Sequence, residues 1–501
     1  MPGDKQGLPS TSDAAPALES QGSATELAEA EEQNRRFNEQ YGATWDGEDD
    51  PSNPYNWSST RKISISVIVS FGQLVTLMST SMMAAALGQI GHDLGISEST
   101  VQITFSIFVL GLAFAPFPIA ALSEMYGRKS VWLVCNTFYI IWNALCPVGN
   151  SPALMVVGRF MAGSGASVGI TLTGPVMADM YSKEQRGKSL SIATFVPYLG
   201  PALGPIVGGL ITEKLQWHWL FWILSVFAGL ITFIGLIFVQ ETYTPVLLRL
   251  KAAAQIDPEL ELSPNPLRRE AYRNFYSRLR VNLLRPLKLL LFRPIIQIMA
   301  LVMALNFAIY CLLLSTFSSL WIDKYGQSEF VSTLHYIAIS IGITVSTQVG
   351  GRTMDYIFKK LKERANGATS PEYRVPYLVP GVLLIPIGLL WAGWSAEYSI
   401  HWIMVDIGTA IFVCGSFVVA QGMLAYLLDE FEHAASANAA SRMLSNILGF
   451  AFPIFAPQMY SRLGYGWGNS LLAFIFVALG CPVPLILWKW GDKLRNLGKE
   501  K

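Results

Sequence analysis

Few residues of this chain have the types and spacing that covalent chemistry requires. The pentapeptide Gly165-Ala-Ser-Val-Gly169 has the GxSxG form of a hydrolase nucleophile, which needs a preceding strand and a histidine and an acid within reach. Here it lies inside an apolar run that predicts a helix, where small residues four apart favour close helix packing. The five cysteines lie in or beside apolar runs, without metal-ligand spacing. The sequence therefore predicts no enzyme activity, no cofactor and no metal site.

One arginine, Arg159, lies inside the apolar run 152–178. A charge at the centre of a membrane costs at least ~2.5 kcal/mol, so this side chain must face a polar cavity or a partner, or extend to the interface. No acidic residue lies at the centre of an apolar run. The candidates for carrying a proton are therefore carboxylates near the ends of such runs, namely Asp179, Glu241, Asp406 and Asp429.

A short turn, Leu122-Ser-Glu-Met-Tyr-Gly-Arg-Lys129, joins two apolar runs. Gly127 permits a tight reversal, and Glu124 can bind an exposed amide or a cation of a neighbouring helix. Such a contact would be a latch that breaks when the two halves of the molecule move, with a solvated loop as the alternative. A similar spacing of a small residue and an acid recurs before basic residues at 351–355. The predicted latch residues are Glu124, Gly127, Arg128, Lys129 and Asp355.

Glycine and proline are concentrated in the decapeptide Gly200-Pro-Ala-Leu-Gly-Pro-Ile-Val-Gly-Gly209, with glycines four residues apart on one face of a predicted helix. Small residues let another helix approach closely, and prolines remove backbone donors and bend the helix. These features predict a pliable gate, and a merely packed, kinked helix is the alternative. The gate residues are Gly200, Pro201, Gly204, Pro205, Gly208 and Gly209.

Isolated polar side chains in the other apolar runs can bind a ligand in an otherwise apolar pocket. The sequence alone does not show whether these residues line a pocket, so a structural role is the alternative for each of them. The candidates are Gln73, Gln102, Tyr198, Asn306, Tyr310, Gln421 and Asn446.

The composition indicates that these residues belong to a membrane protein. Of the 501 residues, 52% are apolar and only 14% are charged, against roughly a quarter charged in typical soluble domains. Apolar runs recur at lengths near the ~20 residues that cross a bilayer as a helix. The fold class predicted is all-α, with twelve spans near 63–90, 100–121, 129–149, 152–178, 189–213, 219–239, 294–322, 331–356, 376–394, 401–427, 437–461 and 469–490.

A polar segment separates the first six spans from the last six. The predicted organisation is a disordered cytosolic tail at 1–60, a six-helix bundle at 61–241, a cytosolic linker at 242–293, a second six-helix bundle at 294–490 and a cytosolic tail at 491–501. Residues 1–60 hold twelve acidic and three basic residues, a composition typical of disorder. The net charge is +1, without a basic face, so nucleic acid is not an expected partner.

Lysine and arginine fall on alternate connections between the spans, as expected when positive residues are retained in the cytoplasm. One set of connections is strongly basic and includes Arg128 and Lys129, while the other carries little beyond Lys214, Lys324 and Arg462. The alternation predicts a multi-pass protein with both termini in the cytoplasm, which an even number of spans requires.

These motifs together resemble the major facilitator superfamily. The turn at 122–129 has the form of the family's signature between helices two and three, and Arg159 matches an arginine of its helix-four motif. The run at 200–209 is similar to the antiporter motif of drug:proton exporters. Segments such as Asn53-Pro-Tyr-Asn-Trp57 and Trp217-His-Trp219 narrow the resemblance to fungal twelve-helix drug:proton antiporters.

The resemblance implies the major facilitator fold and a proton-coupled exporter of a hydrophobic or amphipathic small molecule, with Arg159 assisting the coupling. The expected partners are a small-molecule substrate, protons and the lipid bilayer, and the expected unit is a monomer. The plasma membrane is the expected location, with the vacuolar membrane as an alternative. An importer of a metabolite or organic acid, and a sensor or scaffold that moves no solute, remain as rival hypotheses.

Overall fold

A computed structural model describes residue 32, residue 284 and residues 35–39, 41–47, 49–181, 196–256, 286–365, 369–430 and 434–497. All regular secondary structure in this part of the chain is helical. Residues 1–31, for which disorder is predicted, lie outside the described residues. The start of the fifth predicted span and most of the linker lie outside them as well. The helices described below coincide with all twelve predicted spans, the fifth from residue 196 onward.

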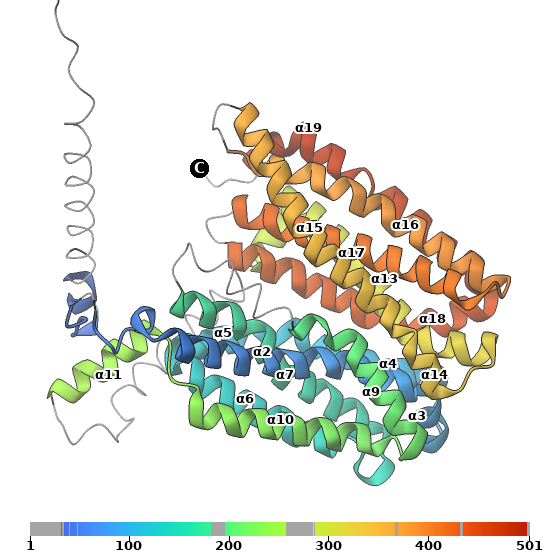
Figure 1. Cartoon of the computed structure of the whole chain (residues 1–501), viewed down its shortest axis with the longest axis horizontal. Helices are drawn as coiled ribbons and strands as arrows, with labels where there is room; N and C mark the ends of the chain where they lie inside the picture. The colour runs from blue at the N-terminus through green and yellow to red at the C-terminus, as the bar shows by residue number, and fades with distance from the viewer. Residues whose placement is uncertain are drawn as a thin grey trace, which may run out of the picture.

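The helices of the first half form one bundle, which lies in the lower part of Figure 1. Two of the predicted spans are each built from consecutive helices, because the first passes through a 3-10 stretch, η2 (Met82–Ala86), and the second bends by 44°. The helices of this bundle are α2 (Ser59–Ser81), α3 (Leu87–Leu94), α4 (Glu98–Phe114), α5 (Pro116–Tyr126), α6 (Arg128–Leu145), α7 (Pro152–Met180), α9 (Gly200–Lys214) and α10 (His218–Phe238).

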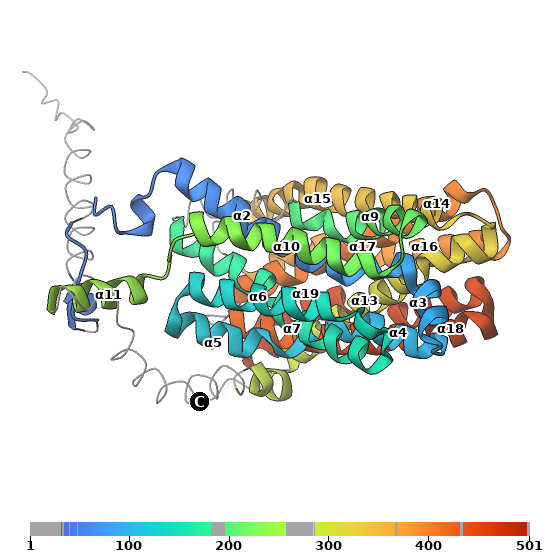
Figure 2. The same ribbon diagram turned by 90° about the horizontal axis from the view of Figure 1, so that it is seen from below.

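The second half forms the other bundle, in the upper part of Figure 1. Helix α11 (Thr244–Ile256) lies between the two bundles in the sequence and projects beyond their ends (Figures 1 and 2). The helices of the second bundle are α13 (Pro294–Ser319), α14 (Glu329–Leu334), α15 (Tyr336–Arg364), α16 (Val375–Glu397), α17 (Trp402–Glu430), α18 (Ala434–Leu479) and α19 (Val483–Asn496).

Hydropathy and exposure together indicate that these helices lie in lipid. Within the described residues, eight helical segments are long and apolar enough to cross a membrane, or nine when the bent pair of α4 and α5 counts as one span. Helix α10 exposes Val226, Leu230 and Phe233 at helical spacing, with Val226 74% exposed. A stripe of large apolar side chains is stable in this position when hydrocarbon surrounds it.

The last two spans form a hairpin within α18, which is broken at Gly464. Gly464 has φ 69° and ψ 176°, a backbone conformation that is essentially confined to glycine. The backbone amide of Gly466 donates to Glu397 Oε2 at 3.0 Å, and the ring of Tyr460 stacks on that of Tyr465 with centroids 4.8 Å apart. These contacts hold the reversal and bring two spans side by side.

Part of the segment predicted as a disordered tail, residues 41–47 and 49–57, packs against the rest of the protein. Trp45 and Trp57 are buried, and Lys251 of α11 pairs with Asp46 and Asp50 at 2.8 and 3.1 Å. Burial disfavours the charge of Asp50, but hydrogen bonds from the amides of Asp46 and Ser52 and from Lys251 outweigh it and lower its pKa to about 2. The acidic composition of the tail gave no sign of this local packing.

The two bundles touch mainly at one end, which we call the far end, and their ribbons diverge toward the opposite, linker end, where α11 begins (Figure 1). At the far end, Gln89 Nε2 donates to Glu329 Oε2 at 2.6 Å across the bundles. Gly209 lies against Thr333, so that a Cβ at residue 209 would be 2.3 Å from Thr333 Oγ1. Ser99 and Gln458 form a further hydrogen bond between the bundles.

The hairpin predicts that Gly464→Ala destabilises the protein, by about 1–3 kcal/mol, because alanine rarely adopts this backbone conformation. A Cβ there would also meet Glu397 Oε2 at 2.5 Å. The measurement is the thermal unfolding of the purified protein in detergent. Gly351→Ala is the matched control, since no atom lies within 4 Å of the added Cβ in helix α15. Equal melting temperatures for the two variants would contradict the prediction.

Candidate functional site

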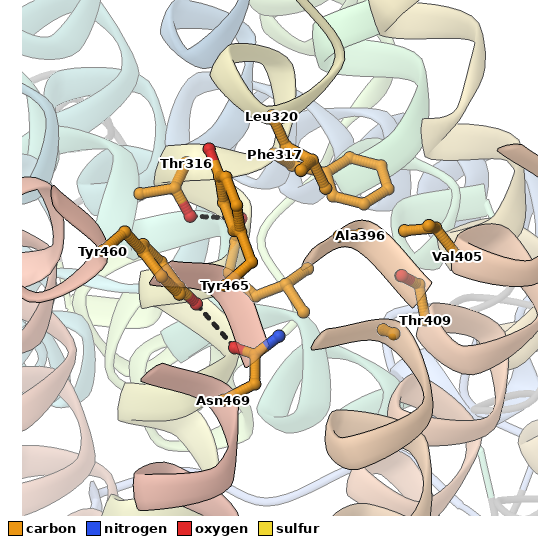
Figure 3. A pocket seen from close by; sticks show the side chains of 11 residues that line it. Thr316, Phe317, Leu320, Ala396, Val405, Thr409, Tyr460, Tyr465 and Asn469 are labelled. Carbon is orange, nitrogen blue, oxygen red and sulfur yellow. Dashed lines mark hydrogen bonds between the residues drawn. The ribbon is translucent and has the colours of Figure 1, made fainter. Parts of the chain in front are cut away.

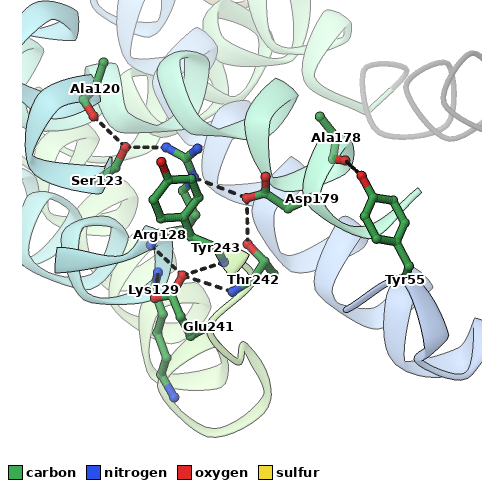
Figure 4. A network of polar contacts seen from close by, with 10 residues as sticks. All are labelled: Tyr55, Ala120, Ser123, Arg128, Lys129, Ala178, Asp179, Glu241, Thr242 and Tyr243. Carbon is green, nitrogen blue, oxygen red and sulfur yellow. Dashed lines mark hydrogen bonds and ion pairs between the residues drawn. The ribbon is translucent and has the colours of Figure 1, made fainter. Parts of the chain in front are cut away.

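The turn between α5 and α6 is held by a carboxylate from a distant part of the chain (Figure 4). Glu241 accepts hydrogen bonds from the backbone amides of Arg128 at 2.8 Å and Lys129 at 3.1 Å. These amides begin α6 and have no partner within the helix, so an anion is stabilised there. Gly127 has φ 91°, and a Cβ at this position would lie 2.1 Å from Glu241 Oε2.

The side chain of Arg128 extends this contact into a network at the linker end (Figure 4). Its Nε lies 3.2 Å from Asp179 Oδ2, its Nη1 donates to Ser123 at 2.6 Å, and its guanidinium lies over the Tyr243 ring. Asp179 also accepts from Thr242 at 3.2 Å. The network thus joins the ends of α5 and α7 and the start of α6 to the segment after α10. Sequence reasoning assigned its members to two separate sites.

Glu124 differs from the other predicted latch residues. It has neither a hydrogen bond nor an ion pair within the described part of the chain, and its neighbour Ser123 binds Arg128 instead. In the second bundle, Arg374 pairs with Asp429 at 2.8 Å and with the exposed Asp355 at 3.5 Å. The structure therefore brings two predicted carboxylates together through an arginine.

Further ion pairs at the linker end were missed by sequence reasoning. Arg495 lies 3.0 Å from Glu430 and 3.1 Å from Glu372, and these contacts join α17, α19 and the segment before α16. Like Arg374, these residues lie at the ends of spans, where charges are common. Charges of opposite sign at several helix ends indicate that ion pairs can form there, but the sequence does not specify which residues pair.

Arg159 is 2% exposed and lies inside the first bundle. Its Nη2 donates to the backbone carbonyls of Ser79 at 3.0 Å and Phe105 at 3.4 Å, and its guanidinium lies 4.4 Å from the ring centroid of Phe108. None of the described carboxylates pairs with it. The arginine therefore connects α7 to α2 and α4 through backbone acceptors, which replace water around the buried charge.

The glycines of α9 are positions of close approach. A Cβ at Gly204 would lie 2.5 Å from Ser81 Oγ, and one at Gly208 would lie 2.7 Å from the carbonyl of Met82. Gly200 similarly faces Leu77, and Pro201 and Pro205 lie within the same helix. This face therefore packs on the first span, while Gly209 points to the other bundle.

Several of the predicted cavity residues are buried and carry polar atoms without a partner. Tyr310 and Asn306 lie one turn apart on α13, and the hydroxyl of the first and Oδ1 of the second bind no described group. Gln73 Oε1 and Gln102 Oε1 are in the same situation. An unsatisfied buried polar atom costs about 1–3 kcal/mol, so such a group in a native protein is expected to bind a further partner, such as a water molecule or a ligand.

Aromatic rings surround the pair on α13. Phe417 of α17 packs edge-on against Tyr310 on one side and against Tyr198 of the first bundle on the other, with centroids 6.0 Å apart in both cases. Of the remaining candidates, Gln421 accepts from the Tyr377 hydroxyl at 3.4 Å, and Asn446 is half-buried. The structure thus brings Tyr198, Asn306 and Tyr310 to one place and leaves Gln421 and Asn446 apart from that contact.

A small cavity lies elsewhere, inside the second bundle (Figure 3). It is lined by residues such as Phe317, Thr409 and Tyr465, and Tyr460 donates to Asn469 at 2.7 Å beside it. None of the seven predicted cavity residues lines it. Within the described residues, no cluster of three or more histidine, cysteine or acidic side chains could hold a metal ion.

A comparison with known protein families identifies the family to which these two helical bundles belong. Residues 69–453 match the model of the Major Facilitator Superfamily, which spans both bundles. The chain belongs to the major facilitator superfamily. Membership confirms the predicted family and the prediction of a multi-pass membrane transporter rather than an enzyme.

Similar members of the superfamily come from fungi. A probable efflux pump of Aspergillus flavus is 38% identical over 423 residues, 83% of this chain and 99% of that protein. An efflux pump of Penicillium aethiopicum is 37% identical over 458 residues, 91% of this chain and 90% of that protein. An uncharacterised transporter of Schizosaccharomyces pombe is 37% identical over 459 residues, with 91% and 93% covered.

Solved structures confirm the fold. The xylose transporter XylE from E. coli, in a partially occluded inward-open conformation, matches with a TM-score of 0.63 and 16% identity over 86% of this chain and 99% of that chain. A POT family transporter in complex with a thioalcohol-conjugated peptide matches with a TM-score of 0.64 and 11% identity, covering 87% and 96%. The predicted major facilitator fold is therefore correct.

The helix-capping role of Glu241 predicts that Glu241→Gln destabilises the protein by about 1–3 kcal/mol, because hydrogen bonds to a charged acceptor are the strong ones. Thermal unfolding in detergent measures the loss. The matched control is Glu124→Gln, which removes a charge from the same turn and is expected to change stability by no more than about 0.5 kcal/mol. If both variants lose the same stability, Glu241 does not hold the turn.

Proposed function

We propose that this protein is a proton-coupled exporter of hydrophobic or amphipathic small molecules, such as a drug, a toxin or a secondary metabolite. The observation that carries the proposal is the similarity, over more than four fifths of the chain, to fungal proteins named as efflux pumps. The glycine face of α9, which resembles the antiporter motif, favours export over import.

The orientation follows from the charges at the two ends of the bundles. The linker end carries Arg128, Lys129 and the basic residues 359–364, so it is the cytoplasmic end under the positive-inside rule. The contacts at Gly209 and Gln89 then close the outer end, while the bundles diverge toward the cytoplasm. Both termini are cytoplasmic, and the protein works as a monomer in the plasma membrane.

Transport would proceed by rocking of the bundles 61–241 and 294–490 about a central site. The described contacts fit this view, because the inter-bundle hydrogen bond between Gln89 and Glu329 is at one end. Opening that end requires the separation of Gly209 from Thr333, where only small side chains touch. The ion pairs at the linker end include the carboxylates of Asp179 and Asp429. These groups would rearrange when the linker end closes.

The central site consists of Asn306, Tyr310 and Phe417 of the second bundle and Tyr198 of the first. The unpartnered hydroxyl and amide oxygen offer hydrogen bonds, and the rings offer apolar contact to a flat or amphipathic ligand. Because Tyr198 and Phe417 belong to different bundles and touch, a ligand at this place would contact both moving parts. Proton coupling would involve Arg159 and one of the carboxylates Asp179, Glu241, Asp406 and Asp429.

The export proposal predicts that cells lacking their own efflux pumps retain less of an amphipathic cation such as rhodamine 6G when they express this chain. A protonophore should abolish the difference, because the proton gradient is the driving force. Arg159→Ala should abolish it as well, with the amount of folded protein checked by gel filtration. Uphill accumulation of a panel of such probes in the cytoplasm would contradict the proposal and favour an importer.

The central site predicts that Tyr310→Phe raises the KM for a transported probe about fivefold to tenfold, because one hydrogen bond contributes about 1 kcal/mol or slightly more. Since the hydroxyl has no hydrogen-bond partner among the described residues, stability should be unchanged or higher. Tyr336→Phe is the matched control, because its hydroxyl donates to the Leu314 carbonyl at 3.0 Å. That variant should lose stability with an unchanged KM, and the reverse pattern would exclude Tyr310 from the site.

A further inference from the structure

A buried histidine lies next to the element that closes the far end. His335 is the residue between α14 and α15, and it is 8% exposed. Helix α14 itself contacts the first bundle through Glu329, which binds Gln89, and through Thr333, which lies against Gly209. Any change in the contacts of His335 therefore acts at the base of this closing helix.

Both ring nitrogens of His335 face oxygen acceptors. Nδ1 lies 2.7 Å from Asp406 Oδ2 on α17, and Nε2 lies 2.9 Å from Gln327 Oε1 in the loop before α14. The imidazole ring is stacked on Trp321, with centroids 3.6 Å apart, and Trp402 packs edge-on at 5.6 Å. The histidine thus connects the loop before α14 to a helix at the side of the bundle.

This arrangement suits the protonated ring. An imidazolium donates from both nitrogens, whereas a neutral imidazole donates from only one of them. The stacked tryptophan face also attracts a cation. Among the described residues, the other oxygen of Asp406 has no hydrogen-bond partner and His335 is the charge partner of this carboxylate. Loss of the proton would therefore remove the positive charge beside Asp406 and leave this half-buried carboxylate without a charge partner among the described residues, which is costly.

Other charged groups near His335 are directed elsewhere. The Tyr325 hydroxyl donates to the carbonyls of Ile400 and Ser395, and Glu329 is bound to Gln89. The remaining ionisable side chains at this corner are exposed to the surroundings, namely Asp323, Lys324 and His401. Within the described residues, Asp406 is accordingly the carboxylate that pairs with His335.

We propose that His335 and Asp406 form a proton-binding latch of the far end. With a proton bound, His335 holds Gln327 and Asp406 together and keeps α14 seated against Gly209 and Gln89. Without it, the charge pair with Asp406 is lost, α14 is released and the far end opens. The inference rests on the proposed function, because a latch has a role only if the two bundles move relative to one another.

The test is a distance measurement on the full chain in lipid nanodiscs, which needs no substrate. Spin labels are attached through Leu215→Cys and Tyr398→Cys, two exposed far-end positions on different bundles, after the five native cysteines are replaced. Pulsed electron paramagnetic resonance then reports the distances between the labels at about pH 5 and about pH 8. We expect a shift to longer distances as the pH rises.

His335→Gln and Asp406→Asn should each lose this shift, since neither variant can form the charged pair. His401→Gln is the matched control, because it removes an exposed histidine that also packs on Trp402 but binds no carboxylate in the described structure, and it should keep the shift. The latch is overturned if both variants at the pair retain the shift, or if His401→Gln abolishes it.

Gly209→Trp provides the open reference, because its side chain cannot fit against Thr333. Long distances in this variant together with an absent pH shift in the parent protein would overturn the latch and leave the proposed function standing. Short distances in this variant at both pH values would contradict the rocking motion itself, and with it the proposed function.

Discussion

The hydrocarbon core of the membrane offers no hydrogen bonds, so the backbone polar groups of each span must be paired within the protein. That constraint accounts for the all-helical architecture, because a helix satisfies its own backbone. It also accounts for the environment of Arg159, whose buried guanidinium binds two backbone carbonyls and lies over an aromatic ring. The charges at the linker end are paired as well, since Glu241 accepts from the backbone amides of Arg128 and Lys129 and Asp179 pairs with the Arg128 side chain.

Some buried side-chain polar atoms have no hydrogen-bond partner among the described residues, and these atoms are candidates for binding a ligand. Two of them, on Asn306 and Tyr310, belong to α13 next to Phe417, and others occur elsewhere among the described residues, for example on Gln73, Trp132 and Asp406. A membrane protein that leaves such groups unsatisfied in one conformation can satisfy them with a ligand or in another conformation. The closed far end is held together by small residues in close contact and by direct hydrogen bonds between the bundles.

Most of the fold could be predicted from the sequence, and much of the site could not. The predicted spans correspond to helices because apolar length and charge alternation are local properties. The break at Gly464 fell between two predicted spans for the same reason. The packing of residues 41–47 and 49–57 could not be predicted, because it depends on the contact between Asp50 and Lys251, about two hundred residues away in the chain. His335 was missed as well, since nothing near it in the sequence identifies Asp406 as its partner.

The sequence by itself determined which segments enter the membrane, their division into two sixes and the family to which they belong. Residue type and spacing suffice for these, because hydrophobicity acts on each segment separately. Only the tertiary structure decided that Glu241 caps α6, that Glu124 has no partner among the described residues, and that His335 meets Asp406 beneath the closing helix. Such contacts depend on distance and direction between helices far apart in the chain, which no local pattern of residues specifies.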